Sequence, residues 1–253
     1  MPGPHLSWQP SLFEVPSPYE EPSLREKASL LEVPSLPEEA GAPARPRADS
    51  HPPSLRRISL DGSSWVDHVP GWLSGSDELF EELAASAQWC QRTRRMFDRE
   101  VLEPRLTAGW RAASGVPLAP SVLEDIRTTL GLHYGVSFDS VGLNLYRDGR
   151  DSVAWHGDRI AREITEPVVA LVSVGAPRPF WLRPSPRRGR GKTVRFLLGR
   201  GDLLVTGGRC QRDWQHSVPK VASTGPRISV AFRHGAVATP LGPDPNDHTS
   251  SSA

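Results

Sequence analysis

From Val136 onward, short apolar runs alternate with glycine, proline and charged turns, a pattern that is typical of β-strands. Within Pro226–His234 every second residue is apolar, so that Ile228, Val230 and Phe232 share one face. We therefore predict seven strands in this part of the chain, over residues 136–146, 167–175, 178–183, 192–198, 202–206, 213–218 and 227–233.

Two stretches ahead of these strands show the longer period of an amphipathic helix. The first lies within residues 74–89 and combines a serine cap with an acidic first turn; its apolar face holds Leu79, Phe80, Leu83 and Ala87. The second follows Pro120, where Ser121 and Glu124 have the spacing of a capping box. Because the helices precede the strands instead of alternating with them, the pattern counts against a doubly wound parallel sheet. It favours a mainly β fold with flanking helices (α+β), built on a double-stranded β-helix, or jelly roll.

The two ends of the chain have a different composition. Residues 1–55 contain 12 of the 26 prolines and no long apolar period, so they cannot bury enough apolar surface to fold. This segment contains an imperfect duplication, SLFEVPSPYEE from Ser11 and SLLEVPSLPEE from Ser29, which fits a solvated leader or a short interaction motif. We predict a disordered leader over 1–55, one domain over 56–235 and a disordered tail over 236–253.

Cysteine usage and hydropathy limit the class of protein. Two cysteines, Cys90 and Cys210, argue against a disulfide scaffold and cannot form a thiolate zinc site, so a metal would need nitrogen and oxygen ligands. The first thirty residues do not resemble a signal peptide, and no span reaches the roughly 18 apolar residues of a membrane helix. We expect a soluble, cytoplasmic monomer.

The charge of the chain is unevenly distributed. The formal net charge is +1, but residues 56–234 alone carry +7 once the acidic leader and tail are set aside. A basic domain is what a polyanion-binding surface requires, although many arginine-rich proteins have no such role.

One short motif predicts a metal site. His156-Gly157-Asp158 places an imidazole and a carboxylate at i and i+2, which project to the same side of an extended segment. His216, on a later predicted strand, could complete two imidazoles and one carboxylate, the facial triad of non-haem iron(II) oxygenases. A surface hydrogen bond between His156 and Asp158 is the alternative.

Two predicted strands direct polar side chains toward the same interior. In the last strand Arg227, Ser229 and Arg233 lie opposite the apolar face, and inward arginines are costly unless they meet anions. A dicarboxylate such as 2-oxoglutarate would meet them, because a guanidinium binds carboxylate bidentately. The strand before the His-x-Asp motif similarly turns Asn144 and Tyr146 inward. Arginines at an exposed strand edge, and polar groups that satisfy backbone atoms of the barrel, are the alternatives.

In this order, these pieces resemble the AlkB family of nucleic-acid dealkylases. The similarity runs from about Trp65 to His234 and is close through GDLLVTGGRCQRDWQHSVPK, residues 201–220. The resemblance implies that iron(II) is bound by His156, Asp158 and His216. It also implies that the cosubstrate 2-oxoglutarate is contacted by Asn144, Tyr146, Arg227, Ser229 and Arg233.

The same resemblance implies a 2-oxoglutarate-dependent dioxygenase that uses iron(II), 2-oxoglutarate and dioxygen. Such enzymes convert 2-oxoglutarate to succinate and carbon dioxide and hydroxylate an alkyl group on a ring nitrogen, which then leaves as an aldehyde. The implied function is DNA repair on N-alkylated bases such as 1-methyladenine and 3-methylcytosine, with the base held out of the stack.

The resemblance says less about the substrate side. Pro104-Arg105 leads toward Trp110, a candidate platform for the base, with a structural tryptophan as the alternative. Ile160 stands where some members of the family have an acidic residue that reads the base. Phosphate contacts could come from Arg92, Arg94, Arg95 and Arg99 or from Arg187, Arg188, Arg190 and Lys192; a solvated face is the alternative for either cluster.

Two other functions stay open on the sequence. The same chemistry could act on RNA, a protein or a small molecule, because fold and cofactor do not fix the substrate. A nucleic-acid binder without catalysis is disfavoured, because the ligand set is intact.

Overall fold

The computed structural model describes residues 45–49, 56–96, 99–158, 164–189 and 191–235. Its secondary structure is mainly antiparallel strands, because most apolar runs are short, β-branched and bounded by turn residues. Every strand predicted between residues 136 and 233 is present with slightly shifted ends, namely β8 (Ser140–Tyr146), β10 (Val169–Gly175), β11 (Arg178–Pro184), β12 (Val194–Leu198), β13 (Asp202–Gly208), β14 (Trp214–Val218) and β15 (Arg227–Arg233).

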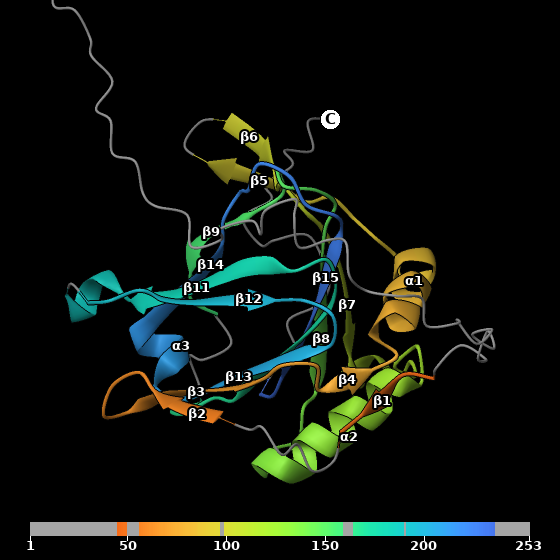
Figure 1. Cartoon of the computed structure of the whole chain (residues 1–253), viewed down its shortest axis with the longest axis horizontal. Coiled ribbons are helices and arrows are strands. Elements are labelled where there is room, and N and C mark those ends of the chain that lie inside the picture. Colours follow the sequence, from red (N-terminus) through yellow and green to blue (C-terminus); the bar gives the residue numbers. More distant parts are fainter. Residues whose placement is uncertain (1–44, 50–55, 97–98, 159–163, 190, 236–253) are drawn as a thin grey trace, which may run out of the picture. The chain divides into compact units, whose positions relative to one another are not determined.

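The larger sheet has seven strands in the order β2-β3-β13-β10-β15-β8-β7 (Figure 1). Three of its strands were not predicted: β2 (Arg56–Ser59), β3 (Ser64–Val69) and β7 (Leu106–Arg111). The smaller sheet has the order β12-β11-β14-β9, and its edge strand β9 (Val153–His156) was also missed. Two antiparallel sheets that share one core confirm the predicted jelly-roll class.

Two short pairs of strands lie outside these sheets. β1 (Arg47–Ala48) pairs with β4 (Leu73–Ser74), and β5 (Thr93–Met96) pairs with β6 (Arg99–Leu102). β1 belongs to residues that the sequence assigned to the disordered leader, and the boundary at residue 55 stays a prediction. The rest of the predicted leader, and the tail from residue 236, lie outside the described residues.

The predicted helices are α1 (Ser76–Ser86) and α2 (Val122–Tyr134). The predicted serine cap of α1 is wrong, because its N-cap is Gly75 in the left-handed conformation and no side chain caps it. The predicted capping box of α2 is also wrong: Ser121 makes no side-chain cap, and the Glu124 carboxylate pairs instead with Arg127 one turn later, a charge-assisted contact. Shorter helical segments are η2 (Ala112–Ser114), η4 (Pro186–Arg188) and α3 (Cys210–Asp213).

The alternation along each strand of the larger sheet divides the core into two parts. One face packs against α1 and α2, through residues such as Leu143, Val172 and Val230. The other face, with Tyr146 and Ala231, meets Phe180 and Leu182 of the smaller sheet. Each fully buried side chain of this kind contributes about 1.5–3 kcal/mol. Within the described part of the chain, no helix is long and apolar enough to cross a membrane.

Candidate active site

The smaller sheet brings the predicted metal ligands together. His156, the last residue of β9, is paired across the ladder with His216 of β14, and the two ring centroids lie 4.2 Å apart. Asp158 follows two residues after His156, so its carboxylate projects to the same side. One ligand atom from each of the three side chains lies within 4.8 Å of the others, which confirms the predicted convergence.

Neighbouring groups fix the orientation of these three side chains. The Nδ1 atom of His156 lies 2.8 Å from the backbone oxygen of Ala154, which directs Nε2 toward the other two ligands. The ring of Phe180 stacks on His216 with centroids 5.4 Å apart. These two contacts orient the imidazoles independently of a bound ion.

A further contact comes from α3, which the sequence did not point to. The backbone N–H of Asp158 donates to Oε1 of Gln211 at 3.4 Å, and the Gln211 amide donates in turn to the Thr206 hydroxyl at 2.8 Å. The buried Gln211 thereby links the ligand loop to β13.

The electrostatic environment favours the charge states that bind metal. Burial disfavours ionisation of Asp158, but the opposing effects prevail and hold the carboxyl pKa well below its usual range. The largest of these opposing effects comes from the Arg233 guanidinium, whose Nε lies 2.9 Å from Oδ2. Burial lowers the pKa of His216 to about 4, against the raising effect of Asp158. At neutral pH the site therefore offers a carboxylate and a neutral imidazole, the protonation states required of ligands.

Arg233 reaches Asp158 because Gly142 leaves space for it. Ser140 of β8 is paired with Arg233, and Gly142 lies two residues along the same strand. A Cβ built on Gly142 would lie 3.0 Å from Nη1 of Arg233. The absence of a side chain at Gly142 thus leaves room for the guanidinium that pairs with Asp158.

The residues expected to bind the cosubstrate are in register on the larger sheet. Asn144 pairs with Ser229 and Tyr146 pairs with Arg227, so that all four face the smaller sheet. Arg227 is 1% exposed, and its Nη2 donates to the hydroxyl of Ser173. Its Nε and Nη1 find no acceptor within the described residues, an arrangement that fits a carboxylate ligand.

Burial shifts the two ionisable groups of this pair. It lowers the pKa of Arg227 to about 10, against the raising effect of the Tyr146 hydroxyl. It raises the pKa of Tyr146, against the lowering effect of the Arg227 charge. Both groups keep their protons at neutral pH, so the pair presents a cation and a phenol donor, which are complementary to an anion.

Of the residues predicted to contact the substrate, Trp110 lies away from the cosubstrate residues. Trp110 pairs with Val141, so its side chain lies on the opposite face of the larger sheet from Asn144 and packs against the helix-side core. This contradicts its predicted role as a base platform, because cross-strand partners share a face. The indole N–H of Trp110 donates to the backbone oxygen of Val116 at 2.6 Å. Ile160 lies outside the described residues.

Arg105 lies beside the cosubstrate residues. Its Nε donates to Oδ1 of Asn144 at 3.0 Å, and its Nη2 is 2.8 Å from the carboxylate of Glu103. Only the oxygen of an amide can accept from a guanidinium, so this bond assigns Oδ1 to Arg105 and leaves the side-chain nitrogen of Asn144 as a donor for another group.

Several of the cations that the sequence offered as phosphate contacts lie on the surface. Arg187, Arg188 and Lys192 are exposed at the turn between β11 and β12, and Arg188 pairs with Asp213. Arg92 and Arg94 are exposed at β5. The side chains of Arg95, Arg99 and Arg190 are outside the description.

Comparison with known proteins gives one family. The model of the 2OG-Fe(II) oxygenase superfamily matches residues 66–233. The chain is 36% identical over 194 residues to bovine "Alpha-ketoglutarate-dependent dioxygenase alkB homolog 3", covering 70% of this chain and 68% of that protein. It is 32% identical over 226 residues to "DNA oxidative demethylase ALKBH2" of Arabidopsis thaliana, covering 74% and 71% respectively.

The solved structure of OsALKBH1 matches 70% of this chain and all of its own with a TM-score of 0.51. At 14% identity this likeness supports the fold alone.

Proposed function

Because the chain belongs to the AlkB family of the 2OG-Fe(II) oxygenase superfamily, we propose that it oxidatively removes alkyl groups from ring nitrogens of bases in DNA. The enzyme class is a 2-oxoglutarate-dependent dioxygenase, and its cofactor and cosubstrates are iron(II), 2-oxoglutarate and dioxygen. The observation that carries the proposal is the cluster of His156, Asp158 and His216. It occurs together with the buried Arg227, which has two N–H groups without an acceptor among the described residues.

The donor set fits iron(II), since two imidazoles and one carboxylate on one face leave positions for a keto acid and dioxygen. When bound, iron supplies the oxidation of the alkyl carbon. We assign the metal to His156, Asp158 and His216, with Arg233 keeping the carboxylate ionised. Arg227 is assigned to the distal carboxylate of 2-oxoglutarate.

The remaining cosubstrate contacts follow from the register of β8 and β15. Asn144 is assigned as an amide donor, with Arg105 fixing its orientation, and Tyr146 as a phenol donor beside Arg227. Ser229 faces the same side as Asn144 and is 6% exposed, so it lies within this group. These contacts orient the keto acid before the substrate enters.

Nucleic acid is the proposed partner because relatives named as DNA demethylases align over most of the domain. The exposed arginines and lysine of the β11–β12 turn are proposed to contact phosphates, which position the strand without reading its sequence. RNA with the same lesions is the alternative substrate. We also propose that the enzyme acts as a monomer, which light scattering with and without an oligonucleotide tests.

The test begins with anaerobic loading of iron(II) and 2-oxoglutarate, followed by dioxygen and oligonucleotides that contain 1-methyladenine or 3-methylcytosine. We expect formaldehyde and the restored base in equal amounts, with succinate formed alongside. His216→Ala serves as the control and should give none of these products. Succinate without restored base would contradict the nucleic-acid substrate, while the absence of succinate would contradict the assigned site.

A further inference from the structure

A second arginine lies deep in the same region as Arg227. Arg178, the first residue of β11, is fully buried at 0% exposure, and its guanidinium carbon lies 5.5 Å from the ring centroid of Tyr146. The guanidinium carbon of Arg227 lies 5.6 Å from the same centroid. One phenol therefore contacts two buried cations, one from each sheet; we call these three residues the Tyr146 cluster.

The Tyr146 cluster has more positive charge than its surroundings compensate. Three guanidinium nitrogens of the cluster are buried and find no acceptor among the described residues, namely Nε of Arg178 and both Nε and Nη1 of Arg227. Burial lowers the pKa of Arg227, and the charge of Arg178 lowers it further. Two buried cations that repel each other are costly unless an anion joins them.

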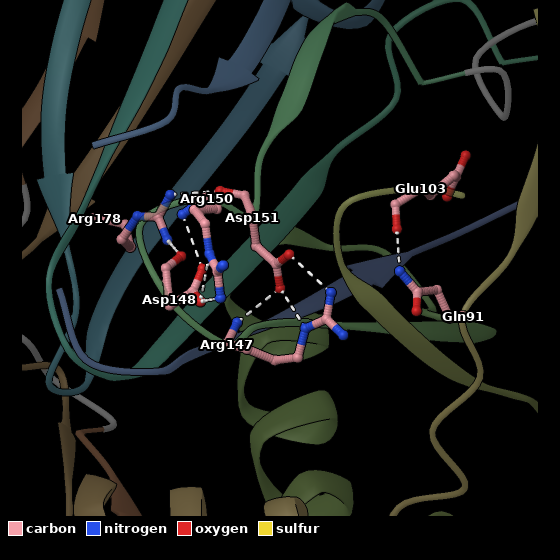
Figure 2. A network of polar contacts seen from close by, with 7 residues as sticks. All are labelled: Gln91, Glu103, Arg147, Asp148, Arg150, Asp151 and Arg178. Carbon is pink, nitrogen blue, oxygen red and sulfur yellow. Dashed lines mark hydrogen bonds and ion pairs between the residues drawn. The ribbon is translucent and has the colours of Figure 1, made fainter. Parts of the chain in front are cut away.

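Arg178 is also held firmly in place. Its Nη1 donates to the backbone oxygen of Asp148 and its Nη2 to that of Asp151, both at 2.7 Å (Figure 2). The Nη2 atom also donates to the backbone oxygen of Pro219 at 3.0 Å. These bonds fix the guanidinium between the loop that joins β8 to β9 and the residue that follows β14.

Ion pairs connect the residues of that loop. Figure 2 shows the Arg147 guanidinium against the Asp151 carboxylate, with Nε 2.8 Å from Oδ2, and Arg150 against Asp148. The Asp151 carboxylate is therefore already engaged by Arg147, and it also accepts from the Arg147 backbone N–H. Arg178 meets backbone oxygens rather than these carboxylate oxygens, so its full charge is not neutralised by direct contact.

We propose that Arg178 is a selectivity residue of the cosubstrate site: its fixed positive charge adds to that of Arg227, so that the site prefers a doubly charged oxo acid. Arg178 acts through charge on the distal end of the ligand and is a positioning residue, not a catalytic one. The keto acid end, which the metal would hold, should be attracted less strongly by Arg178 than the distal carboxylate is, because the interaction of charges weakens with distance.

The test compares 2-oxoglutarate with 2-oxopentanoate, which has the same keto acid end but no distal carboxylate. Binding to the Mn(II)-loaded protein is measured by calorimetry, without turnover or nucleic acid, so that its result does not depend on the proposed DNA substrate. Arg178→Gln removes the charge, and Arg178→Lys keeps it. We expect Arg178→Gln to weaken 2-oxoglutarate about tenfold and 2-oxopentanoate less than about twofold, with Arg178→Lys keeping the ratio within about threefold.

Several outcomes would overturn the proposal. An equal loss for both ligands would mean that Arg178 only maintains the shape of the site, and no loss would mean that its charge is not felt. A ratio that falls as far in Arg178→Lys as in Arg178→Gln would show that the planar fork matters and not the charge. If Arg178→Gln does not fold, Arg178→Met removes the charge in its place: a fall of about fivefold or more in the ratio supports the proposal, and an unchanged ratio overturns it.

Discussion

Replacing Arg227 by methionine should stabilise the protein without 2-oxoglutarate and abolish the stabilisation that 2-oxoglutarate provides. Two of its buried donors lack acceptors among the described residues, and an unmet donor costs about 1–3 kcal/mol, or about 2–6 kcal/mol together. The variant loses the hydrogen bond to Ser173, which is worth about 1.5–3 kcal/mol because its donor is charged. With the middle of each range, Arg227→Met should therefore raise the free energy of unfolding by about 2 kcal/mol.

The assay is thermal unfolding of the Mn(II)-loaded protein with and without 2-oxoglutarate. A gain of this size corresponds to a rise in Tm of about 2–4 °C for each kcal/mol in a domain of this length. Saturation at 100 times Kd should stabilise the wild type by about 2.7 kcal/mol and leave the variant nearly unchanged. Without 2-oxoglutarate the variant should therefore have the higher Tm. Adding 2-oxoglutarate should reduce this difference in Tm or reverse its sign.

Arg57→Met is the matched control, because Arg57 has a partner. Its guanidinium lies 2.7 Å from the carboxylate of Asp67, which is 0% exposed. Removing it leaves a buried charge for which the Tyr134 hydroxyl is the remaining side-chain donor among the described residues. We expect this variant to be less stable than the wild type with or without 2-oxoglutarate. A lower Tm for Arg227→Met than for the wild type without 2-oxoglutarate would refute the reasoning about unmet donors.

Two other predictions concern the support of the site. Gly142→Ala should displace Arg233 and weaken Mn(II) binding about tenfold, measured by electron paramagnetic resonance, whereas Gly109→Ala should not; equal affinities in both would contradict this. Burial opposes ionisation of Asp61, but hydrogen bonds from Trp214 and the next turn lower its pKa to about 2. Because the folded pKa lies below the unfolded one, this carboxylate stabilises the protein above pH 4, and the effect is lost as the pH falls through 2. Asp61→Asn should therefore lower stability to urea at pH 7 and flatten its decline between pH 4 and 2; an unchanged slope would count against it.

The sequence predicted those parts of the fold whose strands are buried on both faces. β10 and β15 have continuous or alternating apolar residues, and a one-residue shift would have placed Arg227 in the helix-side core. The His-x-Asp motif could be read as a metal site because i and i+2 share a side whatever the surrounding fold. Short strands with mixed residues, such as β9, gave no such pattern.

The face of Trp110 could not be assigned without first recognising β7. Leu106, Ala108 and Trp110 alternate, and that period would have placed all three on the helix side, but threonine and glycine between them weakened the strand signal. The sequence also contained a signal for Arg178, because it stands two residues before Phe180 and four before Leu182. This alternation places all three side chains on the inward face of β11. Gln211 comes from a helix of four residues, too short to show a period.

β9 is the outermost strand of the smaller sheet, only four residues long, and its pairing with β14 shifts register between His216 and Val218. Short edge strands open locally at a small fraction of the cost of global unfolding. A ligand carried on such a strand can leave the ion while the rest of the domain stays folded. The rate of metal exchange should therefore depend on local opening of β9. The backbone amide hydrogens of β9 should exchange with solvent more slowly once an ion is bound by both β9 and β14.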